Sequence, residues 1–356
     1  MKIPHSKPTI EKGDIDAATA VLKSGFIAQG KVVKKFEDAF AKYHEKRGGA
    51  AVSSGTAALH LALLALGIGR GDSVIIPSYV CIALYNAVKY TGAEPILADT
   101  VKDGWDMDAQ QVENYLKNNP KKRVKAIVVV HLFGKPVSMD DYMAISKRYS
   151  IPIIEDCAMA VGAEYKGKKT GSFGEVSIFS FYATKVMTTG EGGMVISNSK
   201  EILDKVKDLR DYDEKKDSRL RFNYKMTDFQ AAMGITQLKK LPVFIKKRRE
   251  TAKKYINGLR GAALLLPETS AHCKNIYYRF VVMMNTPDRF IKDMEKKGII
   301  CRKPVFMPIH KIINSSALPN TENIWKHAVS LPIYPTLKEG DVKRVILHTK
   351  KVLERL

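Results

Sequence analysis

Between about residues 50 and 200, short apolar runs alternate with segments long enough to form a helix. The runs are rich in Val and Ile and too short for helices, and they cover residues 74–76, 95–98, 127–130, 152–154 and 176–179. Continuous apolar runs are typical of strands buried on both faces. Helical segments over residues 56–66, 82–90 and 139–149 separate them. The alternation therefore predicts βαβ units and an α/β fold with a mostly parallel sheet.

The regions on either side of this core differ from it. Residues 12–23 and 32–44 read as two amphipathic helices. From about residue 240 we expect a basic helix, strands over 277–283 and 299–301, a helix over 288–297 and a last helix from 339. Residues 1–240 are therefore predicted to form a large domain that includes the N-terminal helices, and residues 241–356 a smaller α+β domain.

The formal net charge of +22 is the most unusual global property of the chain. It is compatible with nucleic acid, an anionic membrane surface or an acidic small substrate as partner. No helix-turn-helix pattern supports nucleic acid, and no apolar run is long enough to cross a bilayer. The N-terminus is too polar for a signal peptide. We expect a cytoplasmic protein without nucleic-acid or membrane partners.

The four cysteines lie far apart, at positions 81, 157, 273 and 301, with no Cys-x-x-Cys pair. This spacing favours neither a disulfide framework nor a zinc site. We expect no structural metal.

Three segments carry residues suited to chemistry. The first is Ser53-Ser54-Gly55-Thr56, which precedes an apolar helix. The free N–H groups at the start of such a helix bind anions, most naturally a phosphate. An ordinary capped core helix has the same pattern.

The second segment places Glu155 and Asp156 at the end of the run over residues 152–154. Ligands bind at the carboxyl edge of open α/β sheets, where a carboxylate often has a cationic partner. Strand-end acids that face solvent are the alternative.

The third segment contains Lys185, which follows the strand ending at Ser180. Phe179, Phe181 and Tyr182 precede it, and a lysine held among these rings is partly desolvated and suited to act as a nucleophile. A phosphate site, a strand-end carboxylate and such a lysine are together the parts that hold pyridoxal phosphate.

Motifs along nearly the whole chain resemble one family. They include "KSGFIAQGKVVKKFEDAFAKY", "SSGTAALHLALLALGIGRGDSVIIPSY", "SIPIIEDCAMAVGAEYKGKKTGSFGEVSIFSF", "FNYKMTDFQAAMGITQLKKL" and "SLPIYPTL". The chain is similar to the DegT/DnrJ/EryC1/StrS family of PLP-dependent nucleotide-sugar aminotransferases. The resemblance implies the aspartate-aminotransferase-like fold (PLP-dependent fold type I), with a large α/β domain and a small C-terminal one.

The resemblance also assigns roles to residues around the cofactor. Lys185 is expected to form the Schiff base, Asp156 to pair with the pyridine nitrogen, and Ala158 to lie under the ring. Gly55, Thr56 and Ser180 are expected to hold the phosphate.

Members of the family build the site across a homodimer. Asn223 is therefore expected to reach the phosphate of the neighbouring subunit. His310 and Gly30 match family segments near the sugar.

Two positions depart from the family pattern. Met159 stands where members usually have His or Gln near the ring hydroxyl, and it cannot donate a hydrogen bond. The segment Tyr79-Val80-Cys81 lacks the aromatic residue that usually stacks on the ring. Tyr79 is expected to replace that ring, or Cys81 to lie against the cofactor as a small polarisable group. Drift that leaves the chemistry unchanged is the other interpretation.

The resemblance implies that glutamate donates an amino group to a nucleotide-linked ketosugar, in biosynthesis of an amino sugar for a surface polysaccharide or glycan. Alternatives are a transaminase for a cyclitol or another non-nucleotide ketone, and a non-catalytic PLP- or sugar-binding regulator. Lys185 argues against the dehydratase branch of the family, which has histidine there.

Overall fold

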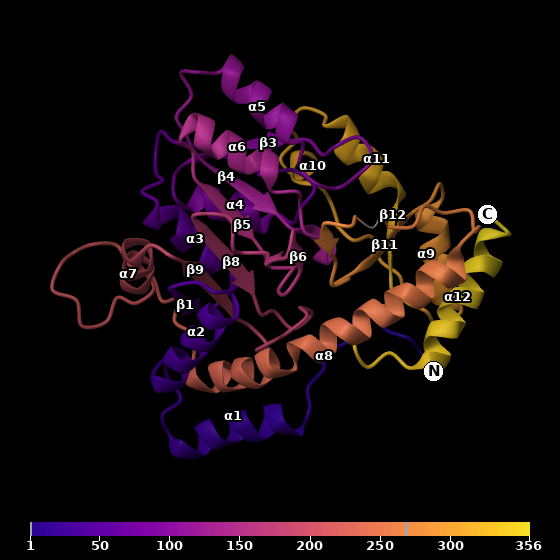
Figure 1. The fold of residues 1–356 in the computed structure, drawn as a ribbon, viewed down its shortest axis with the longest axis horizontal. Coiled ribbons are helices and arrows are strands. Elements are labelled where there is room, and N and C mark those ends of the chain that lie inside the picture. Colours follow the sequence, from indigo (N-terminus) through magenta and orange to yellow (C-terminus); the bar gives the residue numbers. More distant parts are fainter. Residues whose placement is uncertain (1, 268–269) are drawn as a thin grey trace.

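A seven-stranded sheet forms the centre of the computed structural model, which describes residues 2–267 and 270–356. The strand order is β1-β9-β8-β5-β4-β2-β3 (Figure 1). The strands are β1 (Gly48–Val52), β2 (Ser73–Pro77), β3 (Glu94–Ala98), β4 (Val124–Val130), β5 (Ile153–Asp156), β8 (Val176–Ser180) and β9 (Gly193–Ser197). β2 to β5 and β8 pair in parallel, whereas β9 pairs antiparallel with β8 and β1. The predicted α/β fold with a mostly parallel sheet is confirmed.

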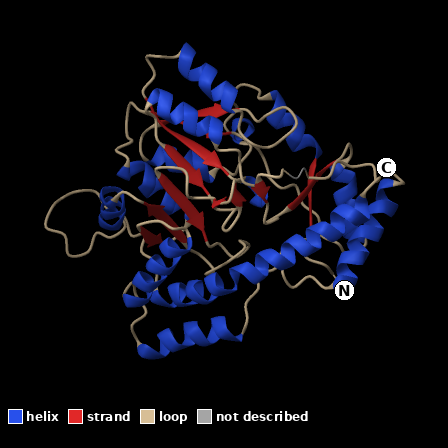
Figure 2. Cartoon of the chain, viewed as in Figure 1, coloured by secondary structure: helices blue, strands red, loops and turns tan. Residues whose placement is uncertain are grey.

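Helices cover both faces of this sheet (Figure 2). On one face, buried side chains of α3 (Gly55–Ala65), α4 (Ala83–Tyr90) and α7 (Lys200–Leu209) share a core with alternate strand residues such as Val128 and Ile178. On the other face, α5 (Ala109–Asn118) and α6 (Asp140–Tyr149) pack on residues such as Val129. Neighbouring strand residues thus enter different cores, as the pleat requires.

The longest helix, α8 (Asp228–Leu259), runs from the sheet to the C-terminal part of the molecule (Figure 1). α1 (Lys12–Ser24) and α2 (Lys31–Tyr43) pack along its first half. It begins well before the predicted basic helix because Thr227 and Gln230 form a capping box. The predicted domain boundary after residue 240 lies within α8, and the division itself stays a prediction.

The C-terminal part has its own core around a two-stranded antiparallel sheet of β11 (Phe280–Met283) and β12 (Ala328–Leu331). Its helices are α9 (Pro287–Lys296), α10 (Ile309–Ile312), α11 (Pro319–His327) and α12 (Glu339–Leu353). Within the described ranges, no helix combines the length and apolar character needed to cross a membrane. The remaining elements are η1 (Leu132–Gly134) and a small sheet of β6 (Glu164–Tyr165), β7 (Lys168–Lys169) and β10 (Cys273–Lys274).

Two strand predictions in this part need correction. The strand expected over residues 299–301 is wrong, because Ile299 bridges to Ile3 whereas Arg302 bridges to Ser330, so no continuous ladder forms. The strand expected from residue 277 begins only at Phe280. Tyr277 has a φ of 51°, in the left-handed region, which is incompatible with a strand.

Arg248 of α8 joins the long helix to the C-terminal part. Its side chain is 2% exposed, and its guanidinium donates to the carbonyls of Tyr277 (3.2 Å), Tyr278 (3.1 Å) and Ile333 (3.1 Å). Burial lowers the pKa of Arg248 to about 10, so it remains charged at neutral pH. Three carbonyls from two segments therefore depend on one buried cation.

We expect Arg248→Met to lower the free energy of unfolding by about 3 kcal/mol, because it leaves buried carbonyls without a donor. Arg249→Met is the matched control, since Arg249 also donates to carbonyls, those of Asn275 and Lys274, but is partly exposed. Arg249→Met should lower the free energy of unfolding by less than about 1 kcal/mol. Urea unfolding followed by circular dichroism measures both. Equal losses in the two variants would contradict the role assigned to Arg248.

Candidate active site

The N-terminus of α3 presents free backbone donors. The Ser54 hydroxyl caps the helix by accepting from the Ala57 N–H at 3.0 Å. In the described part of the chain, the N–H groups of Gly55 and Thr56 have no protein acceptor. They lie at the positive end of an apolar helix, where an anion is stabilised.

Two glycines allow this helix end to approach the sheet closely. A Cβ on Gly55 would lie 2.8 Å from Cβ of Ser180, at the end of β8. A Cβ on Gly193 would lie 2.3 Å from the Ser54 carbonyl oxygen. Any side chain at either position would push α3 away from the strand ends.

One cavity of about 240 Å³ lies at this edge of the sheet. It is lined by Ser54, Gly55, Thr56, Leu59, Cys81, Ala83, Leu84, Asp156, Ala158, Ile178, Ser180, Tyr182, Lys185 and Glu191. Seven of the predicted site residues thus come together, namely Gly55, Thr56, Cys81, Asp156, Ala158, Ser180 and Lys185.

Ser54 and Tyr182 also line the cavity and belong to the predicted segments before α3 and around Lys185, whereas the other lining residues had no predicted role. Ser54 and Glu191 lie in hydroxyl- and glycine-rich segments that were visible in the sequence. Leu59 and Ile178 gave no signal, because an apolar side chain in a core helix or strand looks the same whether or not it borders a cavity.

Asp156 lies at the end of β5 and is 4% exposed. One of its carboxylate oxygens accepts from the Ala158 N–H at 2.9 Å. Burial raises the pKa of Asp156, although this hydrogen bond and the charge of Lys185 oppose the shift. Among the described residues it has no ion-pair partner, so a cationic group in the cavity would stabilise its charged form.

The neighbouring carboxylate, Glu155, points to the opposite side of the strand and is fully engaged. It accepts from the N–H groups of Gly171 (2.8 Å), Phe173 (2.7 Å) and Gly174 (2.6 Å) and lies 3.1 Å from Nε2 of His131. Burial acts to raise the pKa of Glu155, but the hydrogen bonds from His131 and the loop lower it and prevail. Glu155 is therefore a structural carboxylate.

His131 has a defined tautomer in this network. Its Nδ1 accepts from the Val137 N–H at 3.0 Å, so Nε2 carries the proton that Glu155 accepts. Cys157 completes a buried trio whose possible ligand atoms lie within 4.8 Å of one another. Both ring nitrogens of His131 and both Glu155 oxygens already take part in hydrogen bonds.

Lys185 and Tyr182 line the same cavity, but the two phenylalanines expected around Lys185 lie elsewhere. Phe179 and Phe181 are buried on the α2 side, with their ring centroids 4.8 and 5.3 Å from that of Phe40. Strand alternation directs Ser180, between them, to the cavity instead. The aromatic contact of Lys185 is Tyr278, whose ring centroid lies 5.3 Å from Nζ.

The three candidates for contact with a cofactor ring occupy different environments. Cys81 is exposed and lines the cavity. Tyr79 is fully buried, packs edge-on against Phe133 at 6.2 Å and does not line the cavity. Met159 is partly buried between two hydrophobic cores and is not a lining residue either.

The remaining predicted residues lie outside the cavity of the single chain. The N–H of Gly30, at the start of α2, donates to Asp228 at 2.8 Å, and a Cβ there would lie 2.9 Å from that carboxylate. Nδ1 of His310 is 2.8 Å from the Ser78 hydroxyl, and burial lowers the His310 pKa. Asn223 is exposed.

Comparison with known proteins gives a consistent result. Residues 8–350 match the model of the DegT/DnrJ/EryC1/StrS aminotransferase family. The chain is 36% identical to the GDP-perosamine synthase of Escherichia coli O157:H7, over 96% of this chain and 95% of that protein. It is 33% identical to the UDP-4-amino-4,6-dideoxy-N-acetyl-beta-L-altrosamine transaminase of Campylobacter jejuni (serotype O:23/36, strain 81-176), over 99% and 98%. The crystal structure of DesV from S. venezuelae in complex with a ketimine intermediate superposes with a TM-score of 0.91 at 32% identity, covering 96% of this chain and 95% of that chain.

We expect the two adjacent carboxylates to affect the stability of the cofactor-free protein in opposite directions. Burial raises the pKa of Asp156, so its ionisation weakens the fold as pH rises from its ordinary pKa of 3.8 through the folded value. Asp156→Asn should therefore raise the free energy of unfolding at pH 7. Glu155→Gln should lower it by about 2 kcal/mol, because the charged acceptor is lost.

Urea unfolding at pH 7 and at lower pH tests this pair. The pKa of Glu155 is lowered in the folded state, so its contribution is present above its ordinary pKa of 4.5 and is lost as pH falls through the folded value. The difference in the free energy of unfolding between the parent protein and Glu155→Gln should become smaller as the pH is lowered. A shift of both variants in the same direction at pH 7 would contradict the assignment.

Proposed function

Because the chain belongs to the DegT/DnrJ/EryC1/StrS aminotransferase family, we propose that it transfers an amino group from glutamate to a nucleotide-linked ketosugar with pyridoxal phosphate as cofactor. The product would be an amino sugar for a surface polysaccharide or glycan. The observation that carries this proposal is the meeting of Gly55, Asp156, Ser180 and Lys185 in one cavity.

The groups in the cavity fit the cofactor. The free N–H groups of Gly55 and Thr56 and the Ser180 hydroxyl suit a phosphate. Asp156, buried and without an ion-pair partner in the described ranges, suits a protonated ring nitrogen. The Lys185 amine, on the same cavity wall, suits an aldehyde. When bound, the cofactor supplies the electron sink that makes proton removal from an amino acid feasible.

The chain itself contributes binding, charge and a movable proton. Asp156 is poorly hydrated, so a hydrogen-bonded cation beside it remains protonated. Once its amine is free, Lys185 can accept a proton on Nζ at one position in the cavity and release it at another. The α3 N-terminus would hold the phosphate group of the cofactor, at a constant position relative to Nζ of Lys185 and the Asp156 carboxylate.

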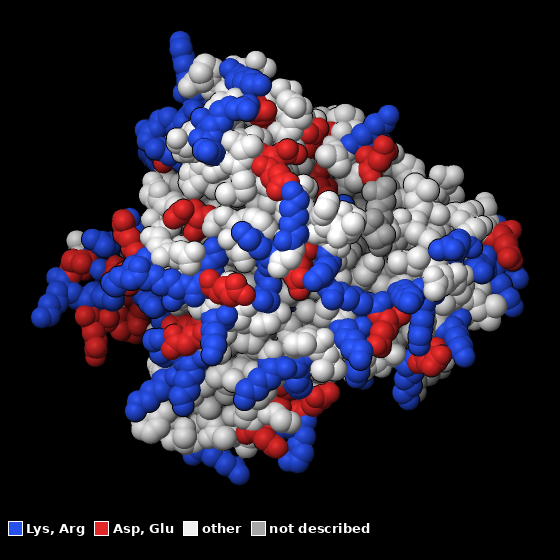
Figure 3. Space-filling model, in the orientation of Figure 1, with Lys and Arg blue, Asp and Glu red and all other residues white. Residues whose placement is uncertain are grey.

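Two observations support a nucleotide-linked acceptor. The relatives compared above are named for GDP- and UDP-linked sugars. The net charge of +22 also favours a polyanionic substrate, and Figure 3 shows Lys and Arg spread over much of one face with fewer Asp and Glu among them.

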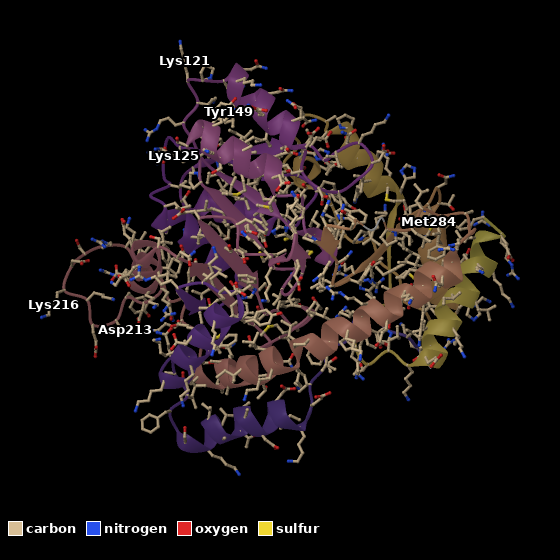
Figure 4. The ribbon with its side chains drawn as sticks, viewed as in Figure 1. Lys121, Lys125, Tyr149, Asp213, Lys216 and Met284 are labelled. Atoms are coloured by element: carbon tan, nitrogen blue, oxygen red, sulfur yellow. The ribbon has the colours of Figure 1, made fainter. Side chains whose placement is uncertain are left out.

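A second copy of the chain is part of the proposal. The segment after α7, which carries Asp213 and Lys216, stands away from the sheet (Figure 4). It exposes Leu220 (75%) and Tyr212 (54%) and leads directly to Asn223. Exposed apolar side chains on a projecting segment support contact with another subunit, where Asn223 would reach the phosphate.

Lys185→Ala tests the proposed covalent role. After borohydride reduction in the presence of pyridoxal phosphate, the parent protein should gain a pyridoxyl adduct on Lys185, and the variant none. Transamination from glutamate to a panel of GDP-, UDP-, dTDP- and CDP-ketosugars should fall by about 10³-fold or more. Lys169→Ala is the control, because Lys169 also lies against a tyrosine ring, 4.9 Å from that of Tyr43, but does not line the cavity. Mass spectrometry locates the adduct, and surviving transamination in Lys185→Ala would refute the assigned role.

Mixing inactive variants tests the shared site. Asn223→Ala and Lys185→Ala should each be nearly inactive alone, but their mixed dimers contain one intact site. Random reassociation should restore about a quarter of the parent activity. Lys185→Ala mixed with Asp156→Asn is the control, because both residues line the cavity of one chain and no mixed dimer has an intact site. If the mixture of Asn223→Ala and Lys185→Ala is no more active than either variant alone, the site is not shared between subunits.

A further inference from the structure

The ammonium group of Lys185 rests against the ring of Tyr278. Nζ lies 5.3 Å from the ring centroid, within the range of a cation–π interaction. In the described ranges, Lys185 has no side-chain hydrogen bond or ion pair, so this ring is its specific contact. Tyr278 is 5% exposed and belongs to the C-terminal part of the chain, just before β11.

The Tyr278 ring is held on several sides. Its hydroxyl lies 3.1 Å from the Thr184 hydroxyl, next to Lys185 in the sequence. The Arg279 guanidinium carbon lies 5.1 Å from the ring centroid. The Tyr278 carbonyl accepts from Arg248 at 3.1 Å. A ring fixed at its hydroxyl, its face and its backbone can hold a flexible lysine in one place.

The backbone around Tyr278 is also anchored to the large sheet region. The Ile276 N–H donates to the Gly134 carbonyl at 2.9 Å, and the Arg279 N–H donates to the Phe133 carbonyl at 3.1 Å. Gly134 has a φ of 93°, and a Cβ there would lie 2.6 Å from the Tyr278 nitrogen. The absence of a side chain at Gly134 therefore lets the segment approach Lys185.

The charges around this ring are all positive. Lys185, Arg248 and Arg279 act on Tyr278, and none of them forms an ion pair with a carboxylate in the described part of the chain. Burial acts to raise the pKa of Tyr278, but these cations and the Thr184 hydrogen bond lower it and prevail. The electron-rich ring face offsets the charge of Lys185 on this side, and the Asp156 carboxylate acts on it across the cavity.

Resting on the proposed function, we propose that Tyr278 is a positioning residue for Lys185: its ring holds the ammonium at the cavity wall whenever the amine is not covalently engaged. A free lysine has several rotatable bonds, and ordering it for proton transfer costs entropy. The ring limits that freedom and keeps Nζ close to the position it must regain. The C-terminal part thereby supports, through Lys185, a cavity whose lining residues all come from the first 191 residues.

A graded series of ring analogues tests this proposal without changing the shape of the core. Position 278 is replaced by Phe and then by mono-, di- and trifluorophenylalanine, which weaken the attraction of the ring for a cation. Nearly equal ring volume preserves packing. The first readout is the acetylation rate of Lys185 by acetic anhydride in the cofactor-free protein, measured by mass spectrometry.

We expect Lys185 acetylation to become faster along the series, by roughly two- to tenfold in total. A ring that attracts cations less strongly stabilises the ammonium form less, and the neutral amine is the form that reacts. In the loaded enzyme, kcat should fall by a similar factor while KM for glutamate stays constant. Lys169, against the unchanged Tyr43, is the internal reference and should keep its acetylation rate. Thr184→Val, which removes only the partner of the Tyr278 hydroxyl, should change either readout by no more than about twofold.

An acetylation rate of Lys185 that stays constant along the series overturns the proposal, whatever happens to kcat. Fluorination of a ring with only a structural role would not change the reactivity of Lys185. Tyr278→Leu, which removes the ring, is the reference variant. A loss of kcat in Tyr278→Phe as large as in Tyr278→Leu also overturns the proposal, since the hydroxyl and not the ring face would then matter. Because acetylation is measured without cofactor, a graded response with no transamination would sink the proposed function and leave the contact established.

Discussion

The parallel pairing of β5 with β8 is the constraint on which the rest of the site depends. In this register Asp156 lies opposite Ile178, so the carboxylate and the Ser180 hydroxyl reach the same edge of the sheet two residues apart. Lys185 lies in the segment that follows β8, and the N-terminus of α3 packs closely against Ser180. A slip of one residue would turn Ser180 toward α2 and Phe179 toward the cavity.

The same alternation explains why two adjacent carboxylates have different roles. Glu155 faces the loop of residues 171–174, whose N–H groups stabilise its charge, whereas Asp156 faces the cavity and has a single backbone donor. The sequence places both acids at a strand end but does not say which face each one takes, because the register is a property of the assembled sheet. The preference for Asp156 came from the family motif.

Local patterns predicted the features that depend on neighbouring residues, and they failed where distant segments meet. Apolar runs located the five predicted sheet strands, and the hydroxyls before α3 marked its free end. The aromatic surroundings predicted for Lys185 were wrong for Phe179 and Phe181, which follow the pleat away from it, whereas Tyr182 lines the same cavity. Tyr278 was read only as part of a strand, because its contact with Lys185 depends on how the C-terminal part packs against the sheet. The strand predicted over residues 299–301 failed for the same reason, because Ile299 and Arg302 pair with two distant segments, at Ile3 and Ser330.

The close approach at Gly55 and Gly193 has a consequence for redesign of the cavity. A Cβ on Gly193 would lie only 2.3 Å from the Ser54 oxygen, so the geometry of the anion-binding end depends on the absence of side chains at these two glycines as much as on the Ser54 cap. Engineering for new substrates therefore has more freedom at the less buried lining residues, such as Cys81 and Ala83, than at these glycines. A mutational library that spares the two positions would sample substrate shape while the anchoring end of the cavity stays constant.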